Sequence, residues 1–166
     1  MILGMSTETY TLIHVLISLV GIASGLIVVY GFLTGKGFHG MTALFLSTTV
    51  LTSVTGFGFP FDHLSPAHKL GIISLVVLAI AISARYLYRL KGSWRWIYVV
   101  TSIIALYLNV FVAVVQAFEK VPALKAMAPT QSEPPFLVAQ VAVLLIFIAI
   151  TIFANKNFRP DTLRDA

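Results

Sequence analysis

The sequence predicts an all-α fold, a polytopic transmembrane bundle of five helices, and three observations support this prediction. Hydrophobic residues make up 58% of the 166 residues and charged residues only 10%, and the mean hydropathy is +0.96, which is more than a soluble domain requires. Five apolar segments are each long enough to cross a hydrocarbon core of roughly 30 Å, which takes about 17 to 25 helical residues. Basic residues gather at alternate ends of these segments. Because the crossings use most of the chain, we expect one transmembrane domain over residues 1–166.

Short polar or glycine- and proline-rich connections separate the five expected helices. These helices span about residues 10–33, 42–58, 66–88, 96–118 and 136–154. The stretch before the first helix lacks the basic residues that open a secretory signal, so we expect this helix to be retained. Ser65 is a favourable N-cap for the third helix, with Pro66 at its first helical position, and Pro134 and Pro135 set the start of the fifth.

The second segment differs from the other four because it is short and rich in hydroxyl groups. It contains Thr42, Ser47, Thr48, Thr49, Thr52, Ser53 and Thr55. Such hydroxyls can bond back to their own helix or across to a neighbour, so we expect a central, well-packed helix. A hydroxyl-lined conduction path is the alternative. If the segment re-entered the membrane instead of crossing it, the number of crossings would no longer be odd.

The distribution of charge predicts the orientation in the membrane. The basic residues near one set of helix ends are Lys36, Arg85, Arg89, Lys91, Arg95, Lys156, Arg159 and Arg164. The other set of ends has only Lys69, Lys120 and Lys125, together with the acidic residues Glu8, Asp62, Glu119 and Glu133. The positive-inside rule therefore places the N-terminus outside and the C-terminus inside. Trp94, Trp96 and Tyr98 are expected to anchor the inner interface, and His39 to be an ordinary interfacial residue.

Polar side chains from four helices are expected at a similar depth near the outer surface. With a rise of about 1.5 Å per residue, four of them lie within roughly two turns of that surface and the fifth lies deeper. The first four are His14, His68, Gln116 and Gln140, and the deeper residue is Asn109. Polar groups inside a membrane are expensive and often functional, so these five are the candidate cofactor-binding residues. The rest of the inner half, apart from the hydroxyls of the second helix, is expected to be nearly all apolar.

Two kinds of cofactor match these residue types. Imidazoles from two helices at matching depth are what an axially ligated haem b requires, which suggests His14 and His68 as ligands. A divalent metal ion held by His14, Asp62, His63 and His68 is the other possibility, although the spacing matches no standard zinc pattern. Polar residues that only join helices by hydrogen bonds are the structural alternative.

Several classes of function find no support in the sequence. The chain has no cysteine, which excludes disulfides and thiolate metal sites. It has no phosphate-binding glycine loop, no His-Glu-x-x-His pattern and no nucleophile elbow, so we expect no catalytic activity of its own. Nucleic-acid binding is not expected either, because the net charge of +5 lies beside membrane ends. The expected partners are the lipid bilayer and another membrane protein or respiratory complex.

Gly21 and Gly25 form a small-xxx-small pair on the same face of the first helix as His14. This arrangement is typical of close helix packing and less often of a dimer interface, so an oligomer that forms through the Gly21/Gly25 face is a further possibility.

Two stretches resemble those of small multipass proteins of bacterial inner membranes. They are Gly56 to His68, with the sequence Gly-Phe-Gly-Phe-Pro-Phe-Asp-His-Leu-Ser-Pro-Ala-His, and Ala128 to Leu137, with the sequence Ala-Pro-Thr-Gln-Ser-Glu-Pro-Pro-Phe-Leu. The resemblance implies a bacterial inner-membrane location and no activity, cofactor or site. Together with the polar residues, it leads to a first hypothesis of cofactor binding in electron transfer or respiratory assembly. A structural or partner-docking subunit is the second hypothesis, and a quinone or small-solute pocket the third.

Overall fold

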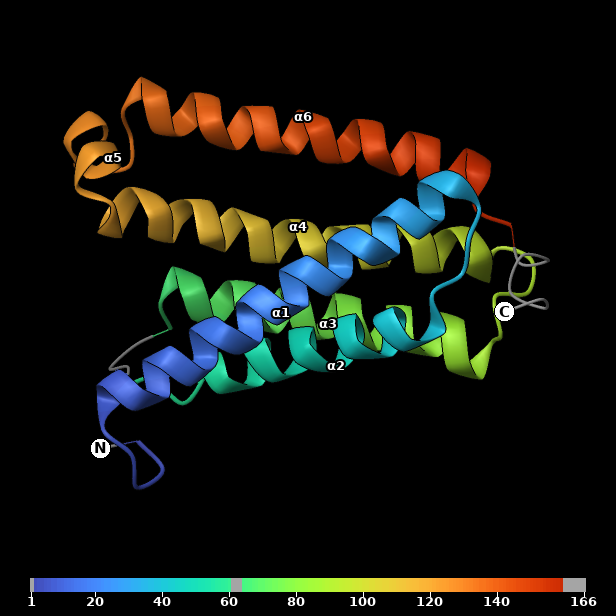
Figure 1. Cartoon of the computed structure of the whole chain (residues 1–166), viewed down its shortest axis with the longest axis horizontal. Coiled ribbons are helices and arrows are strands. Elements are labelled where there is room, and N and C mark those ends of the chain that lie inside the picture. Colours follow the sequence, from blue (N-terminus) through green and yellow to red (C-terminus); the bar gives the residue numbers. More distant parts are fainter. Residues whose placement is uncertain (1, 61–63, 160–166) are drawn as a thin grey trace.

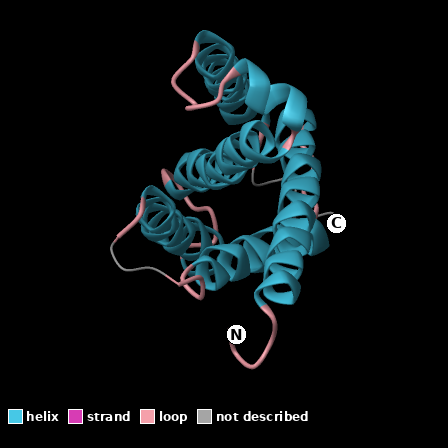
Figure 2. Cartoon of the chain, turned by 90° about the vertical axis from the view of Figure 1, so that its left-hand side faces the viewer, coloured by secondary structure: helices cyan, strands magenta, loops and turns pink. Residues whose placement is uncertain are grey.

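The computed structural model describes residues 2–60 and 64–159, and the elements within these ranges are helical apart from one bridge between Ile2 and Met5. The helices are α1 (Thr7–Thr34), α2 (His39–Gly56), α3 (Pro66–Ile82), α4 (Trp94–Lys120), α5 (Pro122–Met127) and α6 (Pro134–Asn157), and the π-helical turn η1 (Ser83–Leu87) continues α3. Figure 1 shows the long helices running back and forth along the long axis, so that the start of α1 and the end of α6 lie at opposite ends. Figure 2 shows the same helices from the end where α1 begins.

Local sequence signals set the ends of several helices as predicted. The side chain of Ser65 accepts a hydrogen bond from the backbone N–H of His68, and Pro66 is the first residue of α3. Pro134 and Pro135 likewise begin α6. Gly35 ends α1 in the left-handed conformation, with φ of 71°, which a glycine adopts without steric cost. Each of the five predicted segments overlaps one long helix, whereas the short α5 was not expected.

Four helical stretches are long and apolar enough to cross a membrane within the described part of the chain. They are Thr7–Thr34, Pro66–Leu87, Trp94–Lys120 and Pro134–Asn157. These four apolar helices indicate a membrane protein. Because α2 is not among them, the predicted number of five crossings is not established by length and hydropathy alone.

Most hydroxyl groups of α2 donate to backbone carbonyls of their own helix, which is one of the two bonding patterns expected for them. Thr48 donates to the carbonyl of Leu44 at 2.6 Å and Thr49 to that of Phe45 at 2.7 Å. Ser53 donates to the hydroxyl of Ser74 on α3 at 2.9 Å. Since these side chains find partners inside the chain, a hydroxyl-rich helix can lie between more apolar ones.

The glycine face of α1 packs inside the chain. A Cβ atom at Gly25 would lie 2.7 Å from Leu106 of α4 and 2.9 Å from Phe45 of α2. At Gly21 it would lie 3.3 Å from the Thr48 hydroxyl. Both glycines are buried. The Gly21/Gly25 face thus contacts α2 and α4, and it is not free to pair with a second copy.

Large apolar side chains cover the outside of the bundle as well as its core. Val138 and Leu145 on α6 are 66% and 59% exposed, and Leu19 on α1 is 54% exposed. The core contains Phe32, Phe45, Leu78, Tyr98 and Leu106, all at most 2% exposed. Such an apolar outer surface is what contact with lipid requires and what contact with water disfavours.

Candidate functional site

The two ends of the bundle contain different polar residues. The N-terminal end is defined here by the start of α1, the connection from α2 to α3, and α5. The C-terminal end is defined by the connections from α1 to α2 and from η1 to α4, together with the end of α6. The predicted His/Asn/Gln residues belong to the N-terminal half, and we consider them first.

His14 joins α1 to the end of α2. Its Nδ1 atom lies 2.7 Å from the Thr55 hydroxyl, and its ring meets the ring of Phe59 edge-on at 5.2 Å. The hydroxyl of Tyr10, one turn earlier, donates to the backbone carbonyl of Thr55 at 2.7 Å. Two polar side chains of α1 therefore bind the same residue of α2.

His68 lies on the other side of the end of α2. It is 7% exposed, and its Nδ1 atom lies 2.5 Å from the hydroxyl of Ser65. Its ring contacts that of Phe57 at 5.7 Å, and the Phe57 ring also fills the space beside Gly71, where a Cβ atom would lie 3.2 Å away. His14 and His68 thus pack against different aromatic rings.

The three predicted amide residues lie away from the two histidines: Gln140 and Asn109 at other helix interfaces, and Gln116 beside Glu119 of its own helix. Gln140 on α6 donates to the backbone carbonyl of Phe111 on α4 at 3.2 Å, and Gln116 donates to the Glu119 carboxylate at 3.3 Å. The Nδ2 atom of Asn109 lies between α1 and α4, 3.5 Å from where a Cβ atom at Gly21 would be. That atom is buried without a hydrogen-bond partner among the described residues. Gln140 and Asn109 therefore each face a different neighbouring helix.

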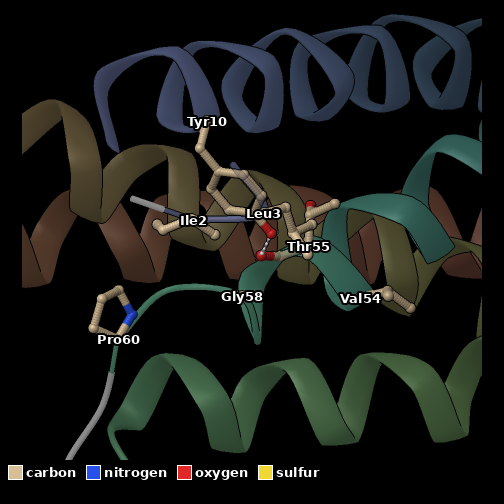
Figure 3. Close-up of a pocket in the computed structure, with 7 residues that line it drawn as sticks. All are labelled: Ile2, Leu3, Tyr10, Val54, Thr55, Gly58 and Pro60. Atoms are coloured by element: carbon tan, nitrogen blue, oxygen red, sulfur yellow. Dashed lines mark hydrogen bonds between the residues drawn. The ribbon is translucent and has the colours of Figure 1, made fainter. Parts of the chain in front are cut away.

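The predicted metal ligands are only partly described. Asp62 and His63 lie outside the described residues, and among those residues the structure forms no group of three or more His, Asp or Glu that could hold a metal ion. A shallow groove of about 460 Å³ lies between the N-terminal stretch and the end of α2. Figure 3 shows that its Tyr10 hydroxyl is bonded to Thr55 and that its other lining side chains include apolar Ile2, Leu3 and Val54. This groove offers few groups for catalysis.

The C-terminal end contains a buried cation that the sequence did not lead us to expect. Arg85, in the π-helical turn η1, is only 9% exposed. It donates to Nδ1 of His39 at 2.9 Å, which requires this nitrogen to be unprotonated, and more weakly to the Tyr98 hydroxyl at 3.4 Å. Its guanidinium carbon also lies 5.3 Å from the centre of the Tyr98 ring and 5.6 Å from that of Tyr86, within the range of cation–π attraction.

This arrangement corrects two expectations. Tyr98 is fully buried against Arg85 instead of anchoring an interface. The half of the bundle that was expected to face inward is therefore not nearly all apolar. His39 is exposed at this end of the bundle, and it also accepts a hydrogen bond from Arg85. Within the described ranges, the acidic residues Glu8, Glu119 and Glu133 all belong to the N-terminal end, so aromatic rings and a neutral imidazole surround the charge of Arg85.

One sequence signal could have placed Arg85 inside. The buried positions of α3 and η1 include Ser74, Leu78, Ala81 and Arg85, which follow one another at steps of four, three and four residues. That spacing defines one face of a helix. Residue type alone favours a place for Arg85 among the exposed charges near a membrane end, because arginine is seldom buried without a partner.

Two further cations, Arg89 and Lys91, line a pocket at this end, which we call the hollow. This pocket of about 440 Å³ is lined by Leu87, Tyr88, Arg89, Lys91 and Trp94. The rings of Tyr88 and Trp94 stack at 3.9 Å with an angle of 2° between their planes. Nearby, Arg95 donates to the carbonyls of Asn155 and Phe158, which ties the start of α4 to the end of α6.

The molecule therefore has a network of neutral polar contacts near one end and a buried cation with a basic, aromatic hollow at the other. Arguments about function rest on these residues themselves. Comparison of the chain with models of protein families, with curated proteins and with solved structures finds no match.

Proposed function

We propose that the chain is a non-enzymatic, multi-pass subunit of a bacterial inner membrane, in which the polar residues of the outer half join helices. One observation supports this most directly: side chains near the N-terminal end bond to the backbone of another element. Tyr10 donates to the carbonyl of Thr55, and Gln140 to that of Phe111. Gln131, in the connection before α6, donates to the carbonyl of Val115 at 3.0 Å. Contacts of this kind hold helices at fixed positions in a membrane.

The proposal includes five crossings with the N-terminal end outside. The clustering of Lys and Arg at the C-terminal end supports this orientation. The self-bonded hydroxyls of α2 support a fifth crossing, because they lower the cost of placing a hydroxyl-rich helix in the membrane.

The absence of cysteine from the sequence makes the orientation straightforward to test. Single cysteines at Ala126 and Pro60 should react with a membrane-impermeant maleimide in intact cells. Cysteines at Gly37 and Ser93 should react only after the membrane is permeabilised. If Gly37→Cys and Pro60→Cys react on the same side, α2 does not cross. If the cysteines at Gly37 and Ser93 react in intact cells and those at Ala126 and Pro60 react only after permeabilisation, the proposed orientation is wrong.

A partner would most readily dock on α6. This helix has the smallest buried share of the four candidate spans, 17% against 28% to 33% for the others. Its large apolar side chains are therefore available to lipid or to a helix of another membrane protein. The proposed role is structural support or docking of such a partner, without chemistry by this chain.

Cofactor binding by His14 and His68 is the second candidate function. The hydrogen bond that fixes the His14 ring favours it. Histidine ligands usually have one ring nitrogen fixed by a hydrogen bond, as Thr55 fixes Nδ1 of His14. However, the rings of Phe59 and Phe57 pack against the two imidazoles. A haem placed between them would have to displace these rings, so the side chains as they lie do not fit a haem. A metal ion would need Asp62 and His63, which lie outside the described residues.

A visible spectrum of the purified protein, oxidised and dithionite-reduced, separates the two candidates when elemental analysis accompanies it. Our proposal predicts no Soret band and no stoichiometric metal, even after haem and metal supplementation. It also predicts that His14→Ala lowers the thermal stability, because a helix contact is lost. A Soret band that shifts on reduction and disappears in His14→Ala would overturn the structural role in favour of haem binding.

A further inference from the structure

We propose that the hollow at the C-terminal end binds the phosphate group of an anionic lipid of the adjacent leaflet. The site is the pocket formed by Leu87, Tyr88, Arg89, Lys91 and Trp94. This inference requires that the chain spans a membrane, but it is independent of whether the polar residues of the other end bind a cofactor.

The location of the pocket matches the depth of lipid headgroups. One candidate span ends at Leu87 and the next begins at Trp94, so the lining residues belong to the short connection between two crossings. Trp and Tyr side chains favour this interfacial level. Leu87 is 70% exposed and can contact the first methylene groups of an acyl chain.

The backbone holds the two cations beside the pocket. Leu90, between Arg89 and Lys91, is buried, and its N–H donates to the carbonyl of Ala84 at 3.0 Å. Arg89 and Leu90 both have positive φ, 49° and 57°, a conformation that costs energy in residues other than glycine. The core contact of Leu90 thus fixes a tight turn, and the two exposed basic residues flank it.

Charge favours an anion of this kind. Both cations are exposed, and no acidic residue of the described ranges belongs to this end of the bundle. An arginine presents a planar, forked donor that suits phosphate oxygens, and a lysine adds a compact point charge. The stacked rings of Tyr88 and Trp94 provide an apolar wall beside these donors. Basic pockets between transmembrane helices bind anionic headgroups by this combination.

Lipid binding can be measured by native mass spectrometry of the full chain in mild detergent. Phosphatidylglycerol and phosphatidylcholine with matched acyl chains are titrated separately, so that net headgroup charge is the variable. The test variant is Arg89→Gln with Lys91→Gln. The matched control is Lys36→Gln with Lys156→Gln, which removes two exposed charges from the same end but outside the pocket. Thermal unfolding of each variant verifies that it is folded.

We expect the wild type to retain phosphatidylglycerol at least about tenfold more tightly than phosphatidylcholine. Each charge-assisted hydrogen bond to phosphate contributes roughly tenfold in affinity, so the pocket variant should weaken phosphatidylglycerol binding by about a hundredfold. The control should change it by less than about threefold, since nonspecific attraction is screened by salt.

Three results would overturn the inference. Equal weakening in the pocket and control variants would show a diffuse basic surface instead of a site. Equal binding of the two lipids would exclude selection by charge. Displacement of the lipid by inorganic phosphate at about its own concentration would identify a free anion, not a lipid headgroup, as the ligand.

Discussion

At the C-terminal end of the bundle, a single guanidinium binds α2, η1 and α4 together, whereas at the N-terminal end several neutral side chains each bind one neighbour. Arg85 contacts His39 and Tyr98, and Tyr10 and His14 both contact Thr55. At the C-terminal end, the stabilising free energy depends on a few atoms around one charge. At the N-terminal end, it is divided among independent hydrogen bonds. The two ends should therefore respond differently to single substitutions.

The physical reason lies in the cost of burying a charge. Removing an ion from water costs several kcal/mol even after the protein relaxes, so loss of a neighbour of Arg85 leaves that cost uncompensated. An interhelical hydrogen bond between neutral groups contributes only about 0.6 to 2 kcal/mol in membranes. Among the described residues, a cation is thus buried at a bundle end without a carboxylate, because aromatic rings and a neutral imidazole surround it.

The largest effect is expected from Tyr98, because it is fully buried and faces Arg85. Tyr98→Ala should lower the free energy of unfolding by about 3 to 5 kcal/mol, because it leaves a cavity and removes a partner of the buried Arg85 charge. Tyr86→Ala is the matched control, since Tyr86 also faces Arg85 but is 54% exposed. It should cost about 1 kcal/mol or less. Denaturation by SDS, followed by circular dichroism, measures both, and equal costs would contradict the central position of Tyr98.

A smaller effect is expected between the two ends, where α1 approaches α2 and α4. Gly25→Val should destabilise the bundle by about 1 to 3 kcal/mol, because its Cβ atom would lie 2.7 Å from Leu106. Gly40→Val is the control, since no atom lies within 4 Å of a Cβ atom there. Thermal unfolding in detergent compares the two. If Gly25→Val left the stability unchanged, the side chains around Gly25 could move aside at little cost. The difference between the two ends would then be harder to attribute to their own contacts.

The hydrogen bond between Ser53 and Ser74 can be used to measure how much one neutral interhelical contact contributes to stability. A double-mutant cycle with Ser53→Ala and Ser74→Ala should give a coupling energy of about 0.6 kcal/mol. The two single variants and the double variant are measured by SDS denaturation. A coupling above about 2 kcal/mol would mean that neutral contacts rival the environment of Arg85, and the contrast between the ends would be lost.

The smallest effect concerns the turn before α6, where the Glu133 side chain bonds back to Thr130 and Ser132. The hydroxyl of Thr130, and then the N–H groups of Thr130 and Ser132, lower the pKa of the Glu133 carboxyl from its ordinary value. A lowered pKa stabilises the fold above the ordinary value of about 4.3, and this contribution disappears as the pH falls through the lowered pKa.

Hydrogen exchange detects this change at single amides. Exchange at Thr130 and Ser132, corrected for its intrinsic pH dependence, should be faster below about pH 4 than at pH 6. In Glu133→Gln the corrected rates should be the same at both pH values. Because Glu133 is exposed, the global unfolding transition should barely change. Unchanged exchange in the wild type would show that the carboxylate does not hold this turn.

Much of the fold followed from the sequence. Apolar length and local caps such as Ser65 and Pro134 depend on neighbouring residues only, which is why the predicted ends agree with the observed helices to within a few residues. The short α5 was missed, because a helix of six residues leaves no periodic pattern. The number of crossings remained open, because the hydroxyls of α2 lower its hydropathy while their actual partners lie within its own backbone.

The sequence by itself determined the helical class, the apolar segments and the excess of basic residues at one set of helix ends, because each depends on composition or local spacing. Only the tertiary structure decided that Tyr98 and His39 are the partners of Arg85, and that His14 and His68 face different rings. These facts depend on which helices become neighbours and on how the π-helical turn directs its side chains. A side chain's partners in a membrane bundle are set by packing between helices distant in sequence, which spacing along one helix does not specify.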